Sequence, residues 1–304
     1  MFTGCGTALV TPFRTDGSLD EPALRRLVRR QIESGIDFLV PCGTTGESPT
    51  LTRAEHLRVV EITLEEAKGK VPVAGGAGGY NTAEVIELAK ELRHLGADGI
   101  LSVTPYYNKP TQEGLYQHYK AIATAVPLPM IVYSVQGRTA CNVEPATMKR
   151  LAEIDTIVAI KEASGNIGQM AQMAHQLPGR ISILCGDDAI AIPLISLGGR
   201  GLISVASNEI PAEMTELTRL ARTGDFAGAR ALQRQWLPLM EVNFVESNPI
   251  PVKAAMAMMG LLEPVWRLPM TPPSEASRVK IEAVLKSTGL LVAASDKHRS
   301  MHAD

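Results

Sequence analysis

The sequence predicts an α/β fold, namely a (β/α)8 TIM barrel with a C-terminal helical extension. Eight short apolar segments alternate with segments of helical periodicity between residues 7 and 224, which is typical of parallel strands joined by helices. An open doubly wound sheet lacks support, because neither GxGxxG nor GxxxxGK[ST] occurs in the chain. Eight repeats therefore favour a closed barrel.

The expected strands are runs of four or five residues, most of them rich in β-branched side chains. In chain order they are 7-TALV-10, 38-FLVP-41, 71-VPVA-74, 99-GILSV-103, 130-MIVY-133, 157-IVAIK-161, 181-ISILC-185 and 201-GLISV-205.

Helices are expected where apolar residues recur every three or four positions, as in 20–34 and 82–95. Asp20 and Thr82 are suitable helix starts, because their side chains can accept hydrogen bonds from the first turn. Glycines stand just before the next strand and suit the left-handed conformation that ends a helix, as at Gly35, Gly96 and Gly198.

After residue 224 the alternation of strands and helices stops. Helical patterns remain at 225–244, 249–260 and 274–287. We therefore expect two units, a barrel over residues 1–224 and a C-terminal helical unit over residues 225–304. The polar tail of the second unit, 292–304, is expected to be frayed.

The composition excludes several classes of protein. The formal net charge of −2, without a basic stripe, argues against nucleic-acid or membrane-surface partners. No apolar stretch reaches the ~20 residues of a membrane span, and the N-terminus lacks the charged region of a secretory signal. We expect a soluble, cytoplasmic protein. Zinc, disulfide or thiol chemistry is not expected, because no CxxC pair or partner histidine accompanies Cys5, Cys42, Cys141 and Cys185.

The polar segments of the chain fall where strands end, which is where the active site of a parallel barrel forms. They are 43-GTTGES-48, 104-TPYYNKP-110, 133-YSVQGRT-139, Lys161, 186-GDD-188 and 206-ASN-208. Because these segments share one rim of the predicted barrel, we expect them to form one site.

Lys161 ends an apolar strand, where an ammonium group is costly to bury. A lysine in such a place can form an imine with a carbonyl substrate, because apolar surroundings favour its neutral form. One alternative is a lysine whose amine reaches solvent. Another, the VAIK motif of protein kinases, fails because no glycine-rich loop, HRD or DFG accompanies it. Glu162 should point away from the barrel interior, because side chains alternate along a strand.

Other residues on this rim suit a carbonyl reaction. The backbone and hydroxyl groups of 43-GTTGES-48 can hold a carboxylate. Tyr133 can pass protons, and the planar guanidinium of Arg138 can bind a carboxylate. Each also has an ordinary interpretation, as a turn, a core aromatic residue or a solvated arginine. Their occurrence together on one rim favours the functional interpretation.

These segments resemble the dihydrodipicolinate synthase branch of the pyruvate-dependent class I aldolase family, which also includes N-acetylneuraminate lyase. The resemblance runs from Gly6 to about Leu290 and rests on GTTGES, PYYNKPTQEGL, YxVxGRT, IKEASGN, GDDA, GLISVASN and NPIPVKAAM. It implies a lyase that condenses pyruvate with L-aspartate 4-semialdehyde to 4-hydroxy-tetrahydrodipicolinate, in lysine and diaminopimelate biosynthesis.

The resemblance implies a covalent imine (Schiff base) between Lys161 and pyruvate. Tyr133 would exchange protons at the new bond, and Thr44 would link it to Tyr107. In the family, this last tyrosine comes from a neighbouring subunit of a homotetramer, which is a dimer of tight dimers. The resemblance implies no redox cofactor and no catalytic metal.

The resemblance also implies how the substrates are bound. Pyruvate would be held by Thr45 and by the backbone near Gly186 and Ile203, and Arg138 would bind the carboxylate of aspartate semialdehyde. The loop that carries Arg138 departs from the family's pattern, because Ser134 and Gln136 stand where Asn and Pro are common.

Some members of the family are inhibited by lysine at a subunit interface. The residues that fit such a pocket here are Ser48, His56, Glu84 and Tyr106. Pro49, Arg53 and Tyr80 depart from its commoner residues, so regulation by lysine stays open.

Two other functions stay open at this point. The first is a 2-keto-3-deoxy sugar acid aldolase of the same family, although Arg138 with PYYNKP favours a small aldehyde that carries a carboxylate. The second is a non-catalytic keto-acid sensor, which would have no use for a proton relay.

Overall fold

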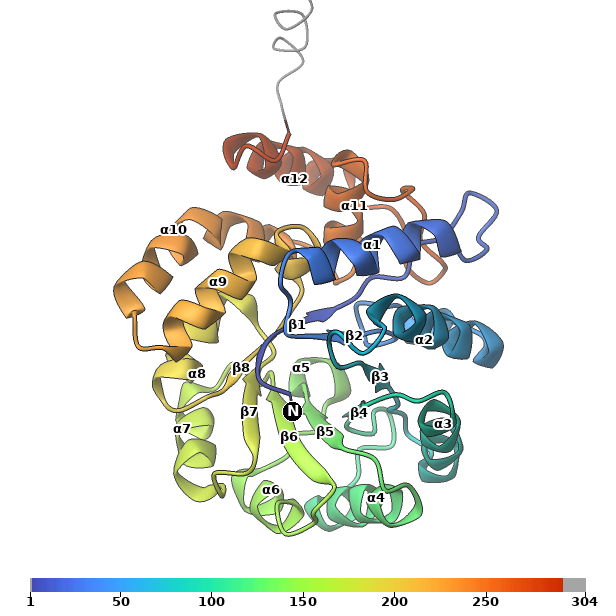
Figure 1. Cartoon of the computed structure of the whole chain (residues 1–304), viewed down its shortest axis with the longest axis vertical. Helices are drawn as coiled ribbons and strands as arrows, with labels where there is room; N and C mark the ends of the chain where they lie inside the picture. Colours follow the sequence, from blue (N-terminus) through green and yellow to red (C-terminus); the bar gives the residue numbers. More distant parts are fainter. Residues whose placement is uncertain (1, 292–304) are drawn as a thin grey trace, which may run out of the picture.

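The computed structural model describes residues 2–291, so the tail expected at 292–304 lies outside the described residues. Eight strands form one sheet: β1 (Gly4–Ala8), β2 (Phe38–Val40), β3 (Ala74–Gly76), β4 (Gly99–Val103), β5 (Met130–Ser134), β6 (Ile157–Glu162), β7 (Ser182–Cys185) and β8 (Gly201–Ser204). All pairs are parallel, and their order is β2-β1-β8-β7-β6-β5-β4-β3. The strands curve around a common centre (Figure 1), and the predicted barrel is confirmed.

The barrel is closed between its two edge strands, β2 and β3, by a single parallel bridge from Leu39 to Val73. The N–H of Leu39 donates to the carbonyl of Pro72, and that of Gly76 to the carbonyl of Pro41, both at 2.9 Å. Position 76 has to be glycine, because a Cβ atom there would lie 1.9 Å from the carbonyl oxygen of Cys42.

Two strands begin and end at other residues than expected. The apolar runs at 7–10 and 71–74 predict strands there, but β1 covers Gly4–Ala8 and β3 covers Ala74–Gly76. Leu9, Val10 and Val73 are nevertheless buried. An apolar run therefore indicates that its residues are buried, but not that their backbones are hydrogen-bonded within the sheet. At Val10, for example, the N–H donates to the side chain of Asn208 at 3.1 Å instead of to a strand.

Helices follow the strands and surround the sheet (Figure 1). Those of the barrel are α1 (Glu21–Glu33), α2 (Arg53–Ala67), α3 (Thr82–His94), α4 (Gln112–Ala125), α5 (Gln136–Thr139), α6 (Pro145–Leu151), α7 (Ile167–Gln176), α8 (Ala191–Ser196) and α9 (Pro211–Arg222).

The residues at the helix ends can be compared with the predicted starts and glycine stops. Asp20 is confirmed as a start, because its carboxylate accepts from the N–H of Ala23 at 3.0 Å. The start at Thr82 is also confirmed, because α3 begins there. The capping side chain, however, belongs to Asn81, which accepts from the N–H of Ala83 at 3.1 Å. The glycine stops are confirmed by left-handed φ angles of 81°, 92° and 105° at Gly35, Gly96 and Gly198.

Two apolar layers are separated by the sheet. The inner layer fills the barrel with Phe2, Ala8, Phe38, Val40, Ala74, Leu101, Ile131, Tyr133, Val135, Ala159, Leu184 and Ile203. The outer layer lies between strands and helices and takes the alternate residues, such as Val132, Ile160 and Leu202. Because successive side chains point to opposite faces, Lys161 points into the barrel and its neighbour Ile160 toward the helices.

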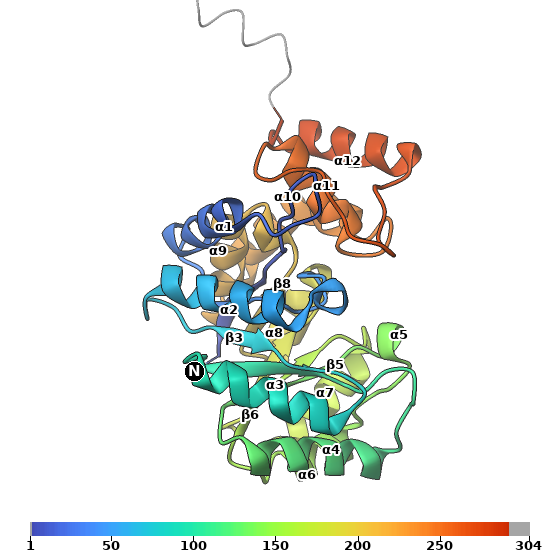
Figure 2. The same cartoon turned by 90° about the vertical axis from the view of Figure 1, so that its right-hand side faces the viewer.

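The C-terminal helical unit consists of α10 (Phe226–Val242), α11 (Ile250–Met258) and α12 (Glu275–Ser287). Figures 1 and 2 show α11 and α12 stacked beyond α1 at one side of the barrel. Arg267 fastens this unit to the barrel by donating to the carbonyl of Gly17 at 2.7 Å and to the carboxylate of Glu55 at 2.6 Å. Within residues 2–291, no helix has the length and apolarity to cross a membrane.

Candidate active site

Lys161 and Tyr133 lie side by side in the barrel interior. They occupy paired positions on β6 and β5, and the Lys161 Nζ lies 4.3 Å from the centre of the Tyr133 ring. Each residue is only 5% exposed. An amine and a phenol at this separation can act on the same bound molecule.

Within residues 2–291, the amine of Lys161 has no carboxylate partner. Among the described lysines, the ones that form ion pairs are Lys90, Lys253 and Lys286. The adjacent Glu162 faces the outer layer, as the alternation predicts, and accepts a hydrogen bond from Gln169 Nε2 at 2.8 Å. Burial raises the pKa of Glu162. The strand therefore presents an amine to the interior without a neutralising charge.

Gly186 and Ile203 also lie at this end of the interior. Gly186 follows β7, and a Cβ atom there would lie 3.1 Å from Lys161 Cε and 2.5 Å from Ala163 Cβ. The position beside the lysine is therefore kept free of a side chain. Ile203 of β8 is fully buried in the inner layer that contains Tyr133.

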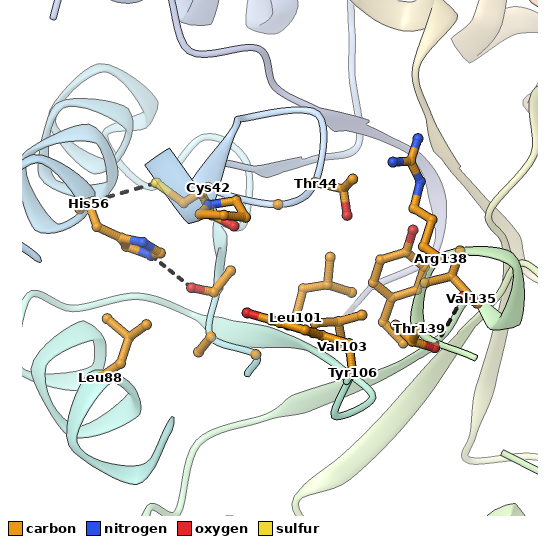
Figure 3. A pocket seen from close by; sticks show the side chains of 17 residues that line it. Cys42, Thr44, His56, Leu88, Leu101, Val103, Tyr106, Val135, Arg138 and Thr139 are labelled. Atoms are coloured by element: carbon orange, nitrogen blue, oxygen red, sulfur yellow. Dashed lines mark hydrogen bonds between the residues drawn. The ribbon is translucent and has the colours of Figure 1, made fainter. Parts of the chain in front are cut away.

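A cavity of about 350 Å³ opens at this rim of the barrel. Thr44 and Arg138 lie at one end of it, and His56 and Leu88 lie at the other (Figure 3). Tyr133 is a wall of the cavity as well as the neighbour of Lys161. The remaining lining residues are Cys42, Gly43, Ser48, Pro49, Gly76, Ala77, Gly78, Leu101, Val103, Tyr106, Val135 and Thr139.

Thr45 and Arg138, the predicted carboxylate-binding residues, are both bonded to Asn248. The buried Thr45 accepts a hydrogen bond at Oγ1 from Asn248 Nδ2 at 2.9 Å. Arg138 Nη2 donates to the main-chain oxygen of Asn248 at 3.1 Å. The sequence interpretation gave Asn248 no role, because a loop residue between two helices carries no local sign that its amide is buried.

The loop that carries Arg138 is closed at its ends by Ser134. The Ser134 hydroxyl donates to Asn142 Oδ1 at 3.2 Å and accepts from the N–H of Val143 at 3.0 Å. Gln136 begins α5 and is exposed. Ser134, which stands where the family commonly has Asn, therefore joins the two ends of this segment by hydrogen bonds.

Tyr107 does not reach the cavity of its own chain. Its side chain is 91% exposed, and its φ of 65° is in the left-handed region. The residue before it, Tyr106, lines the cavity and packs edge-on against Tyr80 with ring centres 5.1 Å apart. One chain thus brings Thr44 and Tyr133 together at the cavity and leaves Tyr107 outside.

The residues that fit a lysine pocket divide between two cavities. Ser48, His56 and Tyr106 line the cavity of about 350 Å³ beside Tyr133, while Glu84 and again Tyr106 line a neighbouring one of about 170 Å³. His56 Nε2 lies 2.8 Å from the carbonyl oxygen of Gly76. Burial lowers the pKa of His56 to about 4, so the imidazole is neutral at pH 7 and donates to that carbonyl.

A buried ion pair joins the loop 43–48 to α11. Lys253 Nζ bonds to the carboxylate of Glu47, and the two side chains are 0% and 1% exposed. Glu47 has a left-handed φ of 53°. The sequence interpretation missed this pair, although the lone lysine in 249-PIPVKAAMAMMG-260 gives the signal that singled out Lys161. A helix that is apolar all round is buried, and a lysine within it requires a buried carboxylate.

Residues 2–291 contain no group of three His, Cys, Asp or Glu side chains able to hold a metal ion. The four cysteines are buried and unbridged. Burial raises the pKa of the Cys5, Cys42 and Cys185 thiols, and a buried, protonated thiol is a poor nucleophile.

Known proteins resemble this chain over almost its whole length. The dihydrodipicolinate synthetase family matches residues 1–288. The 4-hydroxy-tetrahydrodipicolinate synthase of Koribacter versatilis is 54% identical over 289 residues, which cover 95% of this chain and 96% of the relative. The dihydrodipicolinate synthase structure from Thermotoga maritima has a TM-score of 0.94 at 46% identity, covering 96% of this chain and 100% of that one. The enzyme from Acinetobacter baumannii, complexed with pyruvate, has a TM-score of 0.94 at 44% identity and the same coverage.

Proposed function

Because the chain belongs to the dihydrodipicolinate synthetase family, we propose that it condenses pyruvate with L-aspartate 4-semialdehyde to 4-hydroxy-tetrahydrodipicolinate in lysine and diaminopimelate biosynthesis. The observation that carries the proposal is the unpaired amine of Lys161, 4.3 Å from the Tyr133 ring. Thr44 and Arg138 line the adjoining cavity. This arrangement combines a nucleophile, a proton-transfer group and a cation for a carboxylate.

The first half of the reaction takes place on pyruvate. The nitrogen of Lys161 attacks C2, and the carbonyl oxygen takes up protons and leaves as water, which gives the imine. The protonated imine withdraws electrons from C3, so that a C3 proton can leave and an enamine forms. The contact between the Tyr133 ring and Lys161 supports a role for its phenol in exchanging these protons.

The second half joins the two substrates. The enamine C3 attacks the aldehyde carbon, and the aldehyde oxygen takes a proton and becomes a hydroxyl. The amine of the semialdehyde then attacks the imine carbon, the ring closes, and Lys161 leaves as a free amine. Arg138 suits the semialdehyde carboxylate because its guanidinium lines the cavity beside Tyr133.

The proposal also covers cofactors, subunit assembly and cellular location. The imine is itself the electron sink, so the proposed mechanism uses neither a redox cofactor nor a metal. The 91% exposure of Tyr107 supports a homotetramer, a dimer of tight dimers, in which this tyrosine completes the site of a neighbouring chain. A step of amino-acid biosynthesis on small metabolites supports a cytoplasmic location.

The alternatives are not favoured. The relatives that match most of the chain are named as synthases rather than as sugar acid aldolases. A keto-acid sensor would need to bind its ligand but would not need an unpaired amine beside a phenol.

Reduction by borohydride tests the covalent step. Borohydride with pyruvate should inactivate the protein and leave a reduced pyruvate group on Lys161, as seen by peptide mapping. Borohydride alone should leave activity intact, and Lys161→Ala should gain no adduct. An adduct on another lysine, or none at all, would contradict the proposal.

A coupled assay tests the choice of aldehyde. Pyruvate should condense with aspartate semialdehyde far faster than with a panel of sugar-derived aldehydes. Faster turnover of a polyol aldehyde would instead support the function of a 2-keto-3-deoxy sugar acid aldolase.

A further inference from the structure

Asn248 connects two parts of the site that are far apart in the sequence. It stands between α10 and α11 and is 4% exposed. Its Nδ2 donates to Thr45 Oγ1 at 2.9 Å, and its main-chain oxygen accepts from Arg138 Nη2 at 3.1 Å. One residue of the C-terminal helical unit thus contacts side chains of the loop that follows β2 and of α5, which follows β5.

The direction of the bond to Thr45 decides what this hydroxyl can do. A threonine hydroxyl carries one hydrogen and two lone pairs. Because the amide of Asn248 supplies the hydrogen of their shared bond, Thr45 keeps its own. In the part of the chain that the structure describes, no group accepts that hydrogen from Thr45. A carboxylate can only accept hydrogen bonds, so a hydroxyl fixed as a donor is the group that pyruvate needs.

The oxygen of the same amide makes no hydrogen bond within residues 2–291. This atom, Asn248 Oδ1, is buried, and an unsatisfied buried carbonyl oxygen costs free energy. The reverse orientation would let Oδ1 accept the Thr45 hydrogen and would remove the donor. The orientation in the structure preserves the donor of Thr45.

A second contact joins the region of Asn248 to the loop 43–48, which carries Thr45. Lys253, on the following helix α11, forms the buried ion pair with Glu47, which belongs to the loop 43–48 with Thr45. The helix and the loop are therefore joined at two points, one neutral and one ionic. Two such connections restrict movement of the loop relative to Asn248.

We infer that Asn248 is a positioning residue for both substrates, fixing the Thr45 hydroxyl as a donor toward the pyruvate carboxylate and holding Arg138 for the carboxylate of the aldehyde. The inference rests on the proposed function, which supplies the two carboxylates. Asn248 acts through Thr45 and Arg138, and the C-terminal helical unit thereby takes part in substrate binding.

Asn248→Asp tests the direction of the bond. An aspartate has no hydrogen to donate, so it accepts the hydrogen of Thr45 and also repels a carboxylate. The KM for pyruvate should rise about tenfold or more, as expected for the loss of one hydrogen bond to a charged group. The KM for aspartate semialdehyde should change less than about threefold, because every variant keeps the main-chain oxygen that binds Arg138. Asn166→Asp makes the same change at an exposed helix cap and should leave both constants within about twofold.

A double-mutant cycle distinguishes positioning of the Thr45 hydroxyl from a non-specific disturbance of the site structure. Thr45→Val removes the hydroxyl and keeps the shape of the side chain. Asn248→Ala should raise the KM for pyruvate about tenfold in the wild-type background but less than about twofold in Thr45→Val, because the group it acts through is gone. Effects that simply multiply in the double variant would overturn the inference.

Two further measurements keep the inference distinct from the proposed function. Each variant is tested for thermal unfolding and for pyruvate-dependent borohydride trapping on Lys161. A wild-type protein that neither traps pyruvate nor turns over contradicts the proposed function. If the wild type does both, folded Asn248→Asp and Asn248→Ala proteins whose KM for pyruvate is unchanged overturn the inference. If Asn248→Asp fails to fold, the cycle with Asn248→Ala decides.

Discussion

Glu47 and Lys253 meet where solvent does not reach, and the carboxylate of one bonds to the amine of the other. Desolvation of the amine lowers the pKa of Lys253, and the charge of Glu47 opposes that shift. The pair joins the loop 43–48 to α11, so its removal would affect both the barrel and the C-terminal helical unit.

Lys253→Met should destabilise the protein by roughly 3–5 kcal/mol, because it leaves the Glu47 carboxylate buried without a partner. The measurement is the free energy of unfolding in urea. The double variant Glu47→Leu with Lys253→Met removes both charges and should recover much of the loss. A loss below about 1 kcal/mol in the single variant would show that the pair is not a buried charge pair of this kind.

Lys161→Met should have the opposite effect on stability. This replacement removes a buried amine that has no carboxylate partner and substitutes an apolar side chain of similar length. The free energy of unfolding should stay equal or rise by roughly 0.5–2 kcal/mol, while condensation and pyruvate trapping are lost. Because the chemical change is the same as at Lys253, the two variants control for each other. A fall in stability comparable with that of Lys253→Met would show that Lys161 is held as a structural residue.

Glu209 should make stability depend on pH. Burial, and then the charge of Asp188, raise the pKa of Glu209 well above its ordinary value, although the carboxylate accepts from Asn243 Nδ2 at 2.6 Å. The folded state then keeps a proton that the unfolded state releases. The stabilisation is therefore present below the ordinary pKa and is lost as the pH rises through the raised value.

Glu209→Gln imitates the protonated side chain and should remove this dependence. Relative to wild type, its free energy of unfolding should increase as the pH is raised from 5 to 9. Urea denaturation at several pH values measures the difference. Glu216→Gln, at an exposed residue paired with Arg219, should show no such trend in this range. A constant difference for Glu209→Gln would mean that the folded state holds no extra proton.

The sequence predicted the barrel and much of its site because both depend on local patterns. Strand periodicity placed Lys161 in the interior, and the rule for parallel barrels placed Thr44, Tyr133 and Arg138 on one rim. Asn248 and Glu47 were missed for the opposite reason. Their contacts join segments about 200 residues apart, and burial of a polar loop residue is decided by tertiary packing that no short window of sequence records.

Gly186→Ala should impair the reaction without unfolding the protein. The new Cβ would lie 2.5 Å from Ala163 Cβ, so that the backbone around residues 163 and 186 must shift, and 3.1 Å from Lys161 Cε, which must yield slightly. A displacement of this kind should lower kcat/KM by roughly 10–100-fold and slow pyruvate trapping. Gly137→Ala is the matched control, because a Cβ there meets nothing within 4 Å. Equal activity of the two variants would contradict the assigned crowding beside Lys161.

Tyr107→Phe should lower turnover by ~10²–10⁴-fold, the usual effect of losing a proton-transfer partner, and should leave pyruvate trappable on Lys161. If this tyrosine serves a neighbouring chain, Tyr107→Phe mixed with Lys161→Ala should recover some activity. In a mixed dimer, one site combines an intact lysine with an intact tyrosine. A mixture that stays inactive after confirmed subunit exchange would refute the shared site.

The closure of the barrel has a consequence for how activity is lost. β5 and β6 are paired at five positions, whereas β2 and β3 meet at the bridge from Leu39 to Val73 and at the hydrogen bond from the Gly76 N–H to the carbonyl of Pro41. Gly76, at one end of this joint, lines the cavity together with Cys42 and Gly43, which directly precede Thr44. Opening the joint locally would separate Thr44 from Tyr133 while the rest of the sheet stays paired. The strand pair with the fewest contacts in the barrel therefore also borders the active site. On heating, catalysis should be lost at a lower temperature than the one at which the barrel unfolds.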